Sequence, residues 1–392
     1  FNYLLGAYRS KLGLAVLILA AVMPIYALIV TLGRGKFGSV VGIWEIFRNL
    51  MFMKALLPYF LFAYLVSRPQ GLKTALDMLA LHSVIAALAI PLVIFLQIET
   101  AVVLISTSDD DITRLFRAIF PTALLVAAGW LLLWSRYLVQ GGLITLAASM
   151  VCLFATVIQL HRSTIIAVVA VLVFLLVQTL RLRGFSQTNR KRTLAGIAAS
   201  ILITAGYYGF FRLPTTSEFL MSAVDELLSS SGNAGHRTLI ITNSFNYVFS
   251  ETLGLGLGLD WKRVEDLEHY LYAAFVAGPT FDSSYANVII VFGVPGVLLF
   301  VWMLFNLFLI GNLQSCSQTK PEECEVAFFL RPFLLYCAIL GLASDIVMVS
   351  PNAVTFALVI VIAVQLAKLQ RRGGGRKRAA WDDDARLRIL GL

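Results

Sequence analysis

Long apolar runs constrain this chain more than any other feature of its sequence. A helix that crosses a bilayer needs about 20 predominantly apolar residues. Such runs follow one another over residues 12–32, 49–66, 75–98, 118–134, 138–160, 163–180, 193–211, 284–310, 328–349 and 353–369. Only 14% of the residues are charged, whereas soluble domains average about 25%. The sequence therefore predicts an all-α polytopic membrane protein with about ten transmembrane helices.

The distribution of Lys and Arg indicates how these helices are oriented. Most of the 31 Lys and Arg residues fall in one alternate set of connecting segments, which includes residues 181–192 and the tail 371–392. Short segments rich in Lys and Arg lie in the cytoplasm. We therefore expect both termini to be cytoplasmic, which agrees with an even number of spans. The basic tail is typical of a segment that contacts anionic lipids, and without a folded basic domain it does not indicate nucleic-acid binding.

The reactive residue types give no sign of a metal site or a disulfide framework. The four cysteines form no CxxC pair, and the histidines lack the spacing of metal ligands. The run Asp109–Asp111 in the 99–117 loop is interpreted as a solvated acidic segment that caps a helix beginning near Thr113, with a metal site as the weaker alternative. No short apolar segment with a small-residue cleavage site opens the chain, so no cleavable signal peptide is expected. We expect neither a metal ion nor a cofactor.

Residues 212–283 form the longest segment between predicted spans, and they lie on the outer side. A segment of about 70 residues far exceeds an ordinary connector. Amphipathic patterns predict three helices in it, over 217–230, 236–254 and 260–278. The predicted organisation is transmembrane helices 1–7 over 1–211, a helical cap over 212–283, helices 8–10 over 284–370 and a basic cytoplasmic tail over 371–392.

Polar and charged residues enter the outer face at three separate points. Arg162 stands in "QLHRST", where the sixth span begins, and Arg237 stands in the first turn of the second cap helix. The eighth span opens with "DSSYAN", which contains Asp282, Ser283, Tyr285 and Asn287. Positive charge in a first helical turn opposes the helix dipole, and a bound anion would offset that cost. We interpret the three points as one site; the alternatives are a snorkelling Arg162 and a solvated surface Arg237.

Three alternating glycines, Gly254, Gly256 and Gly258, follow the second cap helix in "LGLGLGLD". A dinucleotide-binding motif would need a preceding strand and a βαβ unit, and the sequence predicts neither. Two interpretations stay open. The loop either lets the backbone approach a phosphate closely at the start of the next helix, or it is a flexible hinge.

These segments, in this order, resemble the O-antigen polymerase and ligase family of bacterial envelope glycosyltransferases. "HRST" is similar to the family's arginine at the start of a span, and "GHRTLIITNSFNYVFSETLGLGLG" to its G-R pattern followed by G-x-G. "DSSYANVIIVFGVPG" is similar to its H-N-x-Y pattern followed by G-x-x-G. The matching residues are Arg162, Arg237, Gly256, Gly258, Tyr285, Gly293 and Gly296. The resemblance covers about residues 155–311.

The resemblance implies an enzyme that moves a glycan from an undecaprenyl-diphosphate carrier to a sugar hydroxyl group at the periplasmic face of the bacterial inner membrane. It implies that Arg162 and Arg237 bind the departing diphosphate, whose charge fixed guanidinium groups stabilise. Asp282 is the first candidate for the general base and His236 the second. Implied substrate contacts are Ser283, Tyr285, Asn287, Gly256 and Gly258. The implied partners are the lipid-linked donor and acceptor, membrane lipids and a chain-length regulator protein, with no metal ion or cofactor.

One departure from the family pattern helps to distinguish a polymerase from a ligase. Where the ligases have a histidine, this chain has Asp282, which favours a polymerase, whose motif is more variable. A ligase-type transferase to another acceptor is the alternative within the family. A transporter or flippase of lipid-linked sugar is the alternative from another class, although the sequence shows no internal repeat of the kind that transporters have. The sequence therefore predicts a polymerase of repeat units for O-antigen, capsule or exopolysaccharide.

Overall fold

The computed structural model of this chain describes residues 22–33, 61–68, 70–95, 102–105, 115–118, 123–158, 162–181, 187–206, 232–258, 284–310, 321–343, 352, 354–367 and 369. The labelled helices are α3 (Met23–Gly33), α6 (Gly71–Phe95), α7 (Ala123–Gln140), α8 (Leu143–Ile158), α9 (Arg162–Arg181), α11 (Gly232–Thr252), α13 (Ser284–Ile310) and α14 (Pro321–Ala343). Further helical segments cover 61–66, 187–206 and Val354–Ala367. The strands are β1 (Val102–Ile105) and β2 (Leu115–Ala118). The described chain is therefore predominantly helical.

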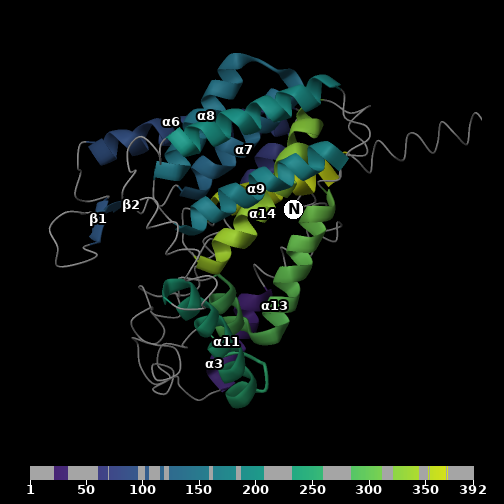
Figure 1. Ribbon diagram of the computed structural model, residues 1–392. Helices are drawn as coiled ribbons and strands as arrows, with labels where there is room; N and C mark the ends of the chain where they lie inside the picture. Colours follow the sequence, from purple (N-terminus) through teal and green to yellow (C-terminus); the bar gives the residue numbers. More distant parts are fainter. Residues whose placement is uncertain are drawn as a thin grey trace, which may run out of the picture.

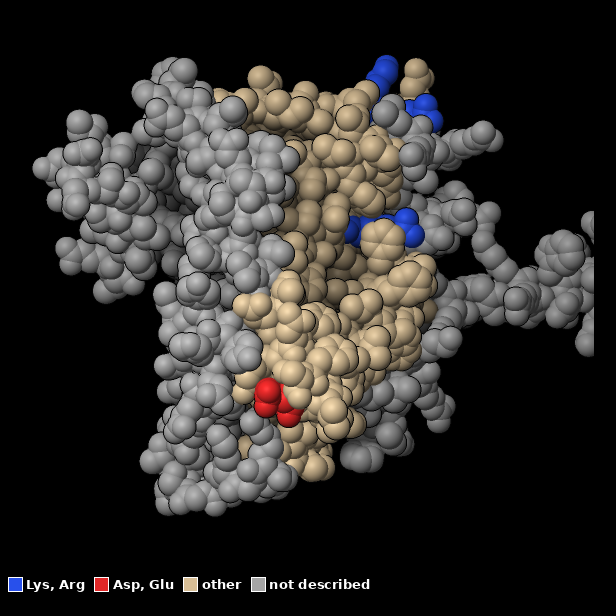
Figure 2. Space-filling view, turned by 60° about the horizontal axis from the view of Figure 1, so that its bottom comes forward, with Lys and Arg blue, Asp and Glu red and all other residues tan. Residues whose placement is uncertain are grey.

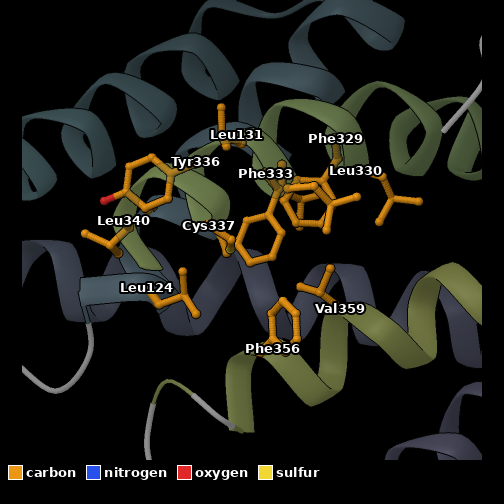
Figure 3. Packing of buried hydrophobic residues seen from close by; sticks show 14 of the residues in the cluster. Leu124, Leu131, Phe329, Leu330, Phe333, Tyr336, Cys337, Leu340, Phe356 and Val359 are labelled. Carbon is orange, nitrogen blue, oxygen red and sulfur yellow. The ribbon is translucent and has the colours of Figure 1, made fainter. Parts of the chain in front are cut away.

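The helices pack in two groups (Figure 1). In that view α6, α7, α8, α9 and α14 gather in the upper part, whereas α3 and α11 lie in the lower part, beside α13. Helices α7 and α14 are apolar around most of their circumference and lie at the centre of the upper group, as expected for helices surrounded by others. Figure 3 shows Phe329, Phe333 and Cys337 of α14 packed between Leu124 and Leu131 of α7 and the helix that carries Phe356 and Val359.

Apolar side chains also cover the outside of these helices. On α6, an exposed stripe at helical spacing consists of Met78, Leu81, Ile85, Leu88 and Leu92. Lys, Arg, Asp and Glu are sparse among the described residues on the face in Figure 2. A soluble monomer rarely exposes a continuous apolar surface of this extent, whereas lipid tails cover one without cost.

Four helices within the described ranges are long and apolar enough to cross a membrane: Gly71–Leu92, Ala123–Gln140, Tyr285–Leu309 and Pro321–Leu342. Shorter apolar helices cover Leu143–Ile158, Ser163–Gln178 and Val354–Ala367. Together with the exposed apolar stripe of α6, these lengths support the prediction of a helical membrane protein.

The junction between the fourth and fifth predicted spans lies later in the chain than expected. The predicted boundary was 134–138, but α7 continues to Gln140 and α8 begins at Leu143. The turn consists of Gly141 and Gly142, whose φ angles of 81° and 98° suit glycine. The guanidinium group of Arg192 donates a hydrogen bond of 3.1 Å to the Leu138 carbonyl oxygen and so stabilises the end of α7.

Arg136, which falls between the predicted spans 118–134 and 138–160, lies on α7 and joins a polar cluster with α6 and α14. Its guanidinium group donates to Glu325 at 3.1 Å and to Asp77 at 2.8 Å. Gln140 also donates to Glu325, whose side chain is 1% exposed. The cluster thus ties the start of α6, the end of α7 and the start of α14 together, and nothing in the local sequence singled out Glu325.

A short pair of strands departs from the all-α prediction. β1 and β2 pair antiparallel, with Val102 opposite Ala118 and Ile105 opposite Leu115. The prediction of a helix that begins near Thr113 is therefore wrong, because β2 starts at Leu115 and the next helix, α7, starts at Ala123. The β-branched and aliphatic residues of these segments favour strand pairing. Residues Asp109–Asp111 lie outside the described ranges.

Candidate functional site

The first turns of α9 and α13 meet the same part of α14. The Tyr285 hydroxyl group, at the start of α13, donates a hydrogen bond of 3.0 Å to the Ala338 carbonyl oxygen of α14. Thr164, in the first turn of α9, lies close to the hydroxyl group of Tyr336, which forms no hydrogen bond to a described residue. Because Tyr336 and Ala338 are neighbours on α14, two of the three segments predicted to converge do lie at one end of the helix bundle.

The sequence correctly identified where α9 begins. α8 ends at Ile158 and α9 starts at Arg162, so the predicted arginine is the first residue of its helix. His236 and Arg237 lie on α11. The structure does not describe the side chains of Arg162, His236 and Arg237, nor Asp282 and Ser283. Their roles in catalysis and diphosphate binding therefore stay predictions.

Helix α11 begins earlier than the sequence indicated. It starts at Gly232 rather than at His236, which puts Arg237 in the second turn. The electrostatic cost of a cation at a helix start falls off within the first turn, so the argument from the helix dipole no longer applies to Arg237. The predicted end is confirmed: α11 stops at Thr252, and the Gly254 amide donates to the Val248 carbonyl oxygen at 3.0 Å.

Helix α13 is broken, although the apolar run 284–310 predicted one continuous span. Gly293 has φ 63° and ψ −157°, which no helical residue adopts, and Pro295 follows it. The rings of Tyr285 and Phe300 have centroids 6.1 Å apart and meet edge to face. In a straight helix the Cα atoms of these residues would be about 22 Å apart, at a rise of about 1.5 Å per residue. The segments 284–292 and 294–310 therefore meet at a sharp bend.

The loop of residues 254–258, here called the glycine plug, fills this break. The Val294 amide donates to the Gly254 carbonyl oxygen at 2.9 Å instead of to Ile290 in its own helix. Two carbonyl oxygens of α13 accept hydrogen bonds from the plug. That of Ile290 accepts from the Leu257 amide at 2.6 Å. That of Val291, which has no partner in its own helix because residue 295 is proline, accepts from the Gly258 amide at 3.2 Å. Non-helical backbone at membrane depth persists only where other groups satisfy its hydrogen bonds. The plug supplies these groups.

Two glycines make this contact feasible. A Cβ atom on Gly256 would lie 2.6 Å from the Gly293 amide nitrogen, and one on Gly293 would collide with the Gly254 carbonyl oxygen. Both residues also have positive φ angles, 86° and 63°, where side chains are strained. The backbone that the plug approaches closely is thus that of α13. The amide groups of Gly256 and Gly258 both donate within the protein, whereas the start of the next helix, where a phosphate was expected, lies outside the described residues. Binding of a phosphate near this loop and a role as a hinge therefore both stay predictions.

Helix α3 supports the plug from the other side. The Tyr26 hydroxyl group donates to the Leu255 carbonyl oxygen at 2.7 Å. A Cβ atom on Gly258 would collide with the Thr31 side chain, and one on Gly296 would lie 3.4 Å from Met23. The last part of residues 232–258 therefore packs between α3 and α13. The helical cap over 212–283 stays a prediction, because much of that segment lies outside the described residues.

The described residues at the start of α13 are enclosed by protein. Asn287 is 1% exposed, and Tyr285 is partly buried with its hydroxyl proton engaged by Ala338. The hydroxyl oxygen of Tyr285 keeps its capacity to accept a hydrogen bond. Contacts of either side chain with substrate stay predictions. Among the described residues, no three His, Cys, Asp or Glu side chains lie close enough together to hold a metal ion.

Comparisons with known proteins do not identify a relative of this chain. No protein-family model matches it, and no curated protein matches it.

Proposed function

We propose that this protein is a glycosyltransferase that polymerises undecaprenyl-diphosphate-linked oligosaccharide repeat units at the periplasmic face of the bacterial inner membrane. The order and spacing of the motifs from Arg162 to Gly296 carry the proposal. Support comes from the first turns of α9 and α13, which carry two of the three motifs and meet the same part of α14. The products would be O-antigen, capsule or exopolysaccharide.

The proposed reaction needs two kinds of group. A hydroxyl oxygen of the acceptor sugar attacks the anomeric carbon of the donor, and the bond from that carbon to the phosphate oxygen breaks. Undecaprenyl diphosphate leaves with the electron pair, and Arg162 and Arg237 stabilise its charge in a partly desolvated site. Asp282 accepts the proton of the hydroxyl group as general base, with His236 as the second candidate. The reaction needs neither a metal ion nor a cofactor.

The proposed topology has about ten transmembrane helices, both termini in the cytoplasm and the site on the periplasmic side. In this topology the Arg136 cluster lies at the cytoplasmic end of α6, α7 and α14, and Tyr285 lies at the opposite end. A chain-length regulator protein is the proposed protein partner. Membrane lipids surround the apolar surface that α6 exposes.

The broken helix α13 is a feature that transporters also have, so the transporter alternative needs a specific answer. In transporters, the unwound backbone of such a helix binds the substrate or coupling ion. Here the carbonyl oxygens of Ile290 and Val291 and the amide of Val294 are already bonded to the glycine plug. The break is thus closed by protein, and this observation favours an enzyme over a transporter.

Purified protein incubated with lipid-linked repeat units alone provides the test. We expect a ladder of longer lipid-linked glycans. Products that form only after a different acceptor is added would support a ligase instead. Movement of the lipid-linked sugar across a vesicle membrane without new glycosidic bonds would overturn both enzyme proposals.

Substitution of the two arginines tests the diphosphate site. We expect Arg162→Ala and Arg237→Ala each to lower the rate of chain extension by about 100-fold or more, the range seen when one charge-stabilising group is removed from an active site. Arg190→Ala is the matched control, because Arg190 is exposed and lies on the predicted cytoplasmic side. Near-normal activity of both site variants would remove the diphosphate role.

A further inference from the structure

The glycine plug connects the helix that carries Arg237 with the bend that orients Tyr285. We infer that the plug is a positioning element: it keeps α13 bent, and so holds residues 284–292 against α14. Only the activity measurement that tests this inference rests on the proposed function, because the geometry of the plug can be measured without any substrate.

The hydrogen bonds explain why α13 needs the plug in order to bend. In a continuous helix Pro295 would leave one carbonyl oxygen, that of Val291, without its usual partner. The observed bend also separates the Val294 amide from the Ile290 carbonyl oxygen, and both groups then need new partners. Gly254 and Leu257 provide them, at 2.9 and 2.6 Å. Without the plug the bent form would leave three backbone groups unpaired at membrane depth, at a cost of several kcal/mol each, so α13 would return towards a straight helix.

Groups outside α13 fix the plug in place. The Gly256 amide donates to the Thr252 hydroxyl oxygen at 3.0 Å, and that hydroxyl group donates to the Val248 carbonyl oxygen at 2.6 Å. Tyr26 of α3 contributes the further bond to Leu255. Thr252 is therefore a second residue, besides Gly256, through which the plug can be loosened, and it belongs to none of the predicted substrate contacts.

The bend sets where the outer end of α13 lies. With α13 bent, Tyr285 contacts Phe300 and bonds to Ala338. Straightening would carry Tyr285 away from Phe300 to a separation of about 22 Å and break the bond to α14. Asp282 and Ser283 directly precede this segment in the sequence. A displacement of about 1 Å at a reacting group already costs about 100-fold in rate, so a loosened plug slows the proposed reaction without touching the substrate.

Hydrogen-exchange mass spectrometry of the full-length protein in detergent, combined with chain-extension kinetics, tests this inference. In the wild type we expect slow exchange in peptides that cover 255–258 and 290–296. Gly256→Ala and Thr252→Val should each speed exchange there by about tenfold or more and lower kcat more than they change KM. Thr252→Ser keeps the hydroxyl group and should behave like the wild type.

Gly129→Ala is the matched control, because the added Cβ would collide with Ser83 at the crossing of α6 and α7, away from the plug. It should lower thermal stability but leave exchange at 255–258 and kcat per folded molecule unchanged.

Fast exchange of the plug peptides in the wild type would overturn the inference whatever the activity. Normal kcat in both Gly256→Ala and Thr252→Val would overturn it too, whereas a wild type that exchanges slowly but makes no polymer would refute only the proposed function.

Discussion

The cluster around Arg136 gives the sharpest prediction for stability, because its two carboxylates differ so much in exposure. The Glu325 side chain is 1% exposed and that of Asp77 48% exposed, yet both bind the same guanidinium group, at 3.1 and 2.8 Å. The substitution Arg136→Leu removes both ion pairs. It keeps the bulk of the side chain and leaves Glu325 buried, with Gln140 as its remaining hydrogen-bond partner in the cluster.

The expected magnitudes follow from burial. Removing one partner of a buried ion pair costs about 3–5 kcal/mol, because the other charge stays in a low-dielectric environment. An exposed pair contributes about 1 kcal/mol or less. We therefore expect Arg136→Leu to lower the free energy of unfolding by about 3–5 kcal/mol and Asp77→Asn by less than about 1 kcal/mol. Glu325→Gln should fall between them, because it removes the buried charge and keeps a hydrogen-bonding group.

Thermal unfolding in one detergent, followed by tryptophan fluorescence at a fixed scan rate, measures the order of these effects. Two of the six tryptophans, Trp130 and Trp134, lie on α7 itself and are buried, so part of the signal reports the helix that carries Arg136. A change of 1 kcal/mol moves Tm by roughly 2 °C in a large chain, which separates Arg136→Leu clearly from Asp77→Asn. Equal losses in these two variants would refute the reasoning, as would a loss in Arg136→Leu no greater than that of Arg190→Leu at an exposed position.

Two further predictions concern helix contacts in the same bundle. Gly129→Ala forces α6 and α7 apart at Ser83 and should lower the free energy of unfolding by about 1–3 kcal/mol, the usual effect of overpacking. Gly206→Ala is the control and should cause no loss of stability, because its new Cβ would meet no atom within 4 Å. Equal Tm values for the two variants would contradict this prediction. Arg192→Gln should lower stability by about 1 kcal/mol through the lost bond to Leu138, and a Tm above that of the wild type would argue against this cap.

The sequence by itself determined the features that depend on local pattern. Apolar runs of membrane length predicted α6 and α9 close to their observed positions, because burial in lipid requires an apolar side chain at nearly every position of a span. Helix α14 (Pro321–Ala343) lies earlier in the chain than its predicted run 328–349. The polar break before Arg162 marked the start of α9, and Gly254 marked the end of α11. These signals lie within a few residues of the structure that they predict.

Tertiary structure alone decided which groups far apart in the sequence form hydrogen bonds and ion pairs with one another. The run 284–310 is as apolar as a straight span, and the glycines at 254–258 are compatible with a hinge, so neither segment alone indicates that the plug closes the bend at Gly293. The pairing of Arg136 with Glu325 was equally absent from local pattern. A buried backbone or charged group needs a partner wherever the chain can supply one, and that partner is chosen by packing in three dimensions rather than by spacing along the sequence.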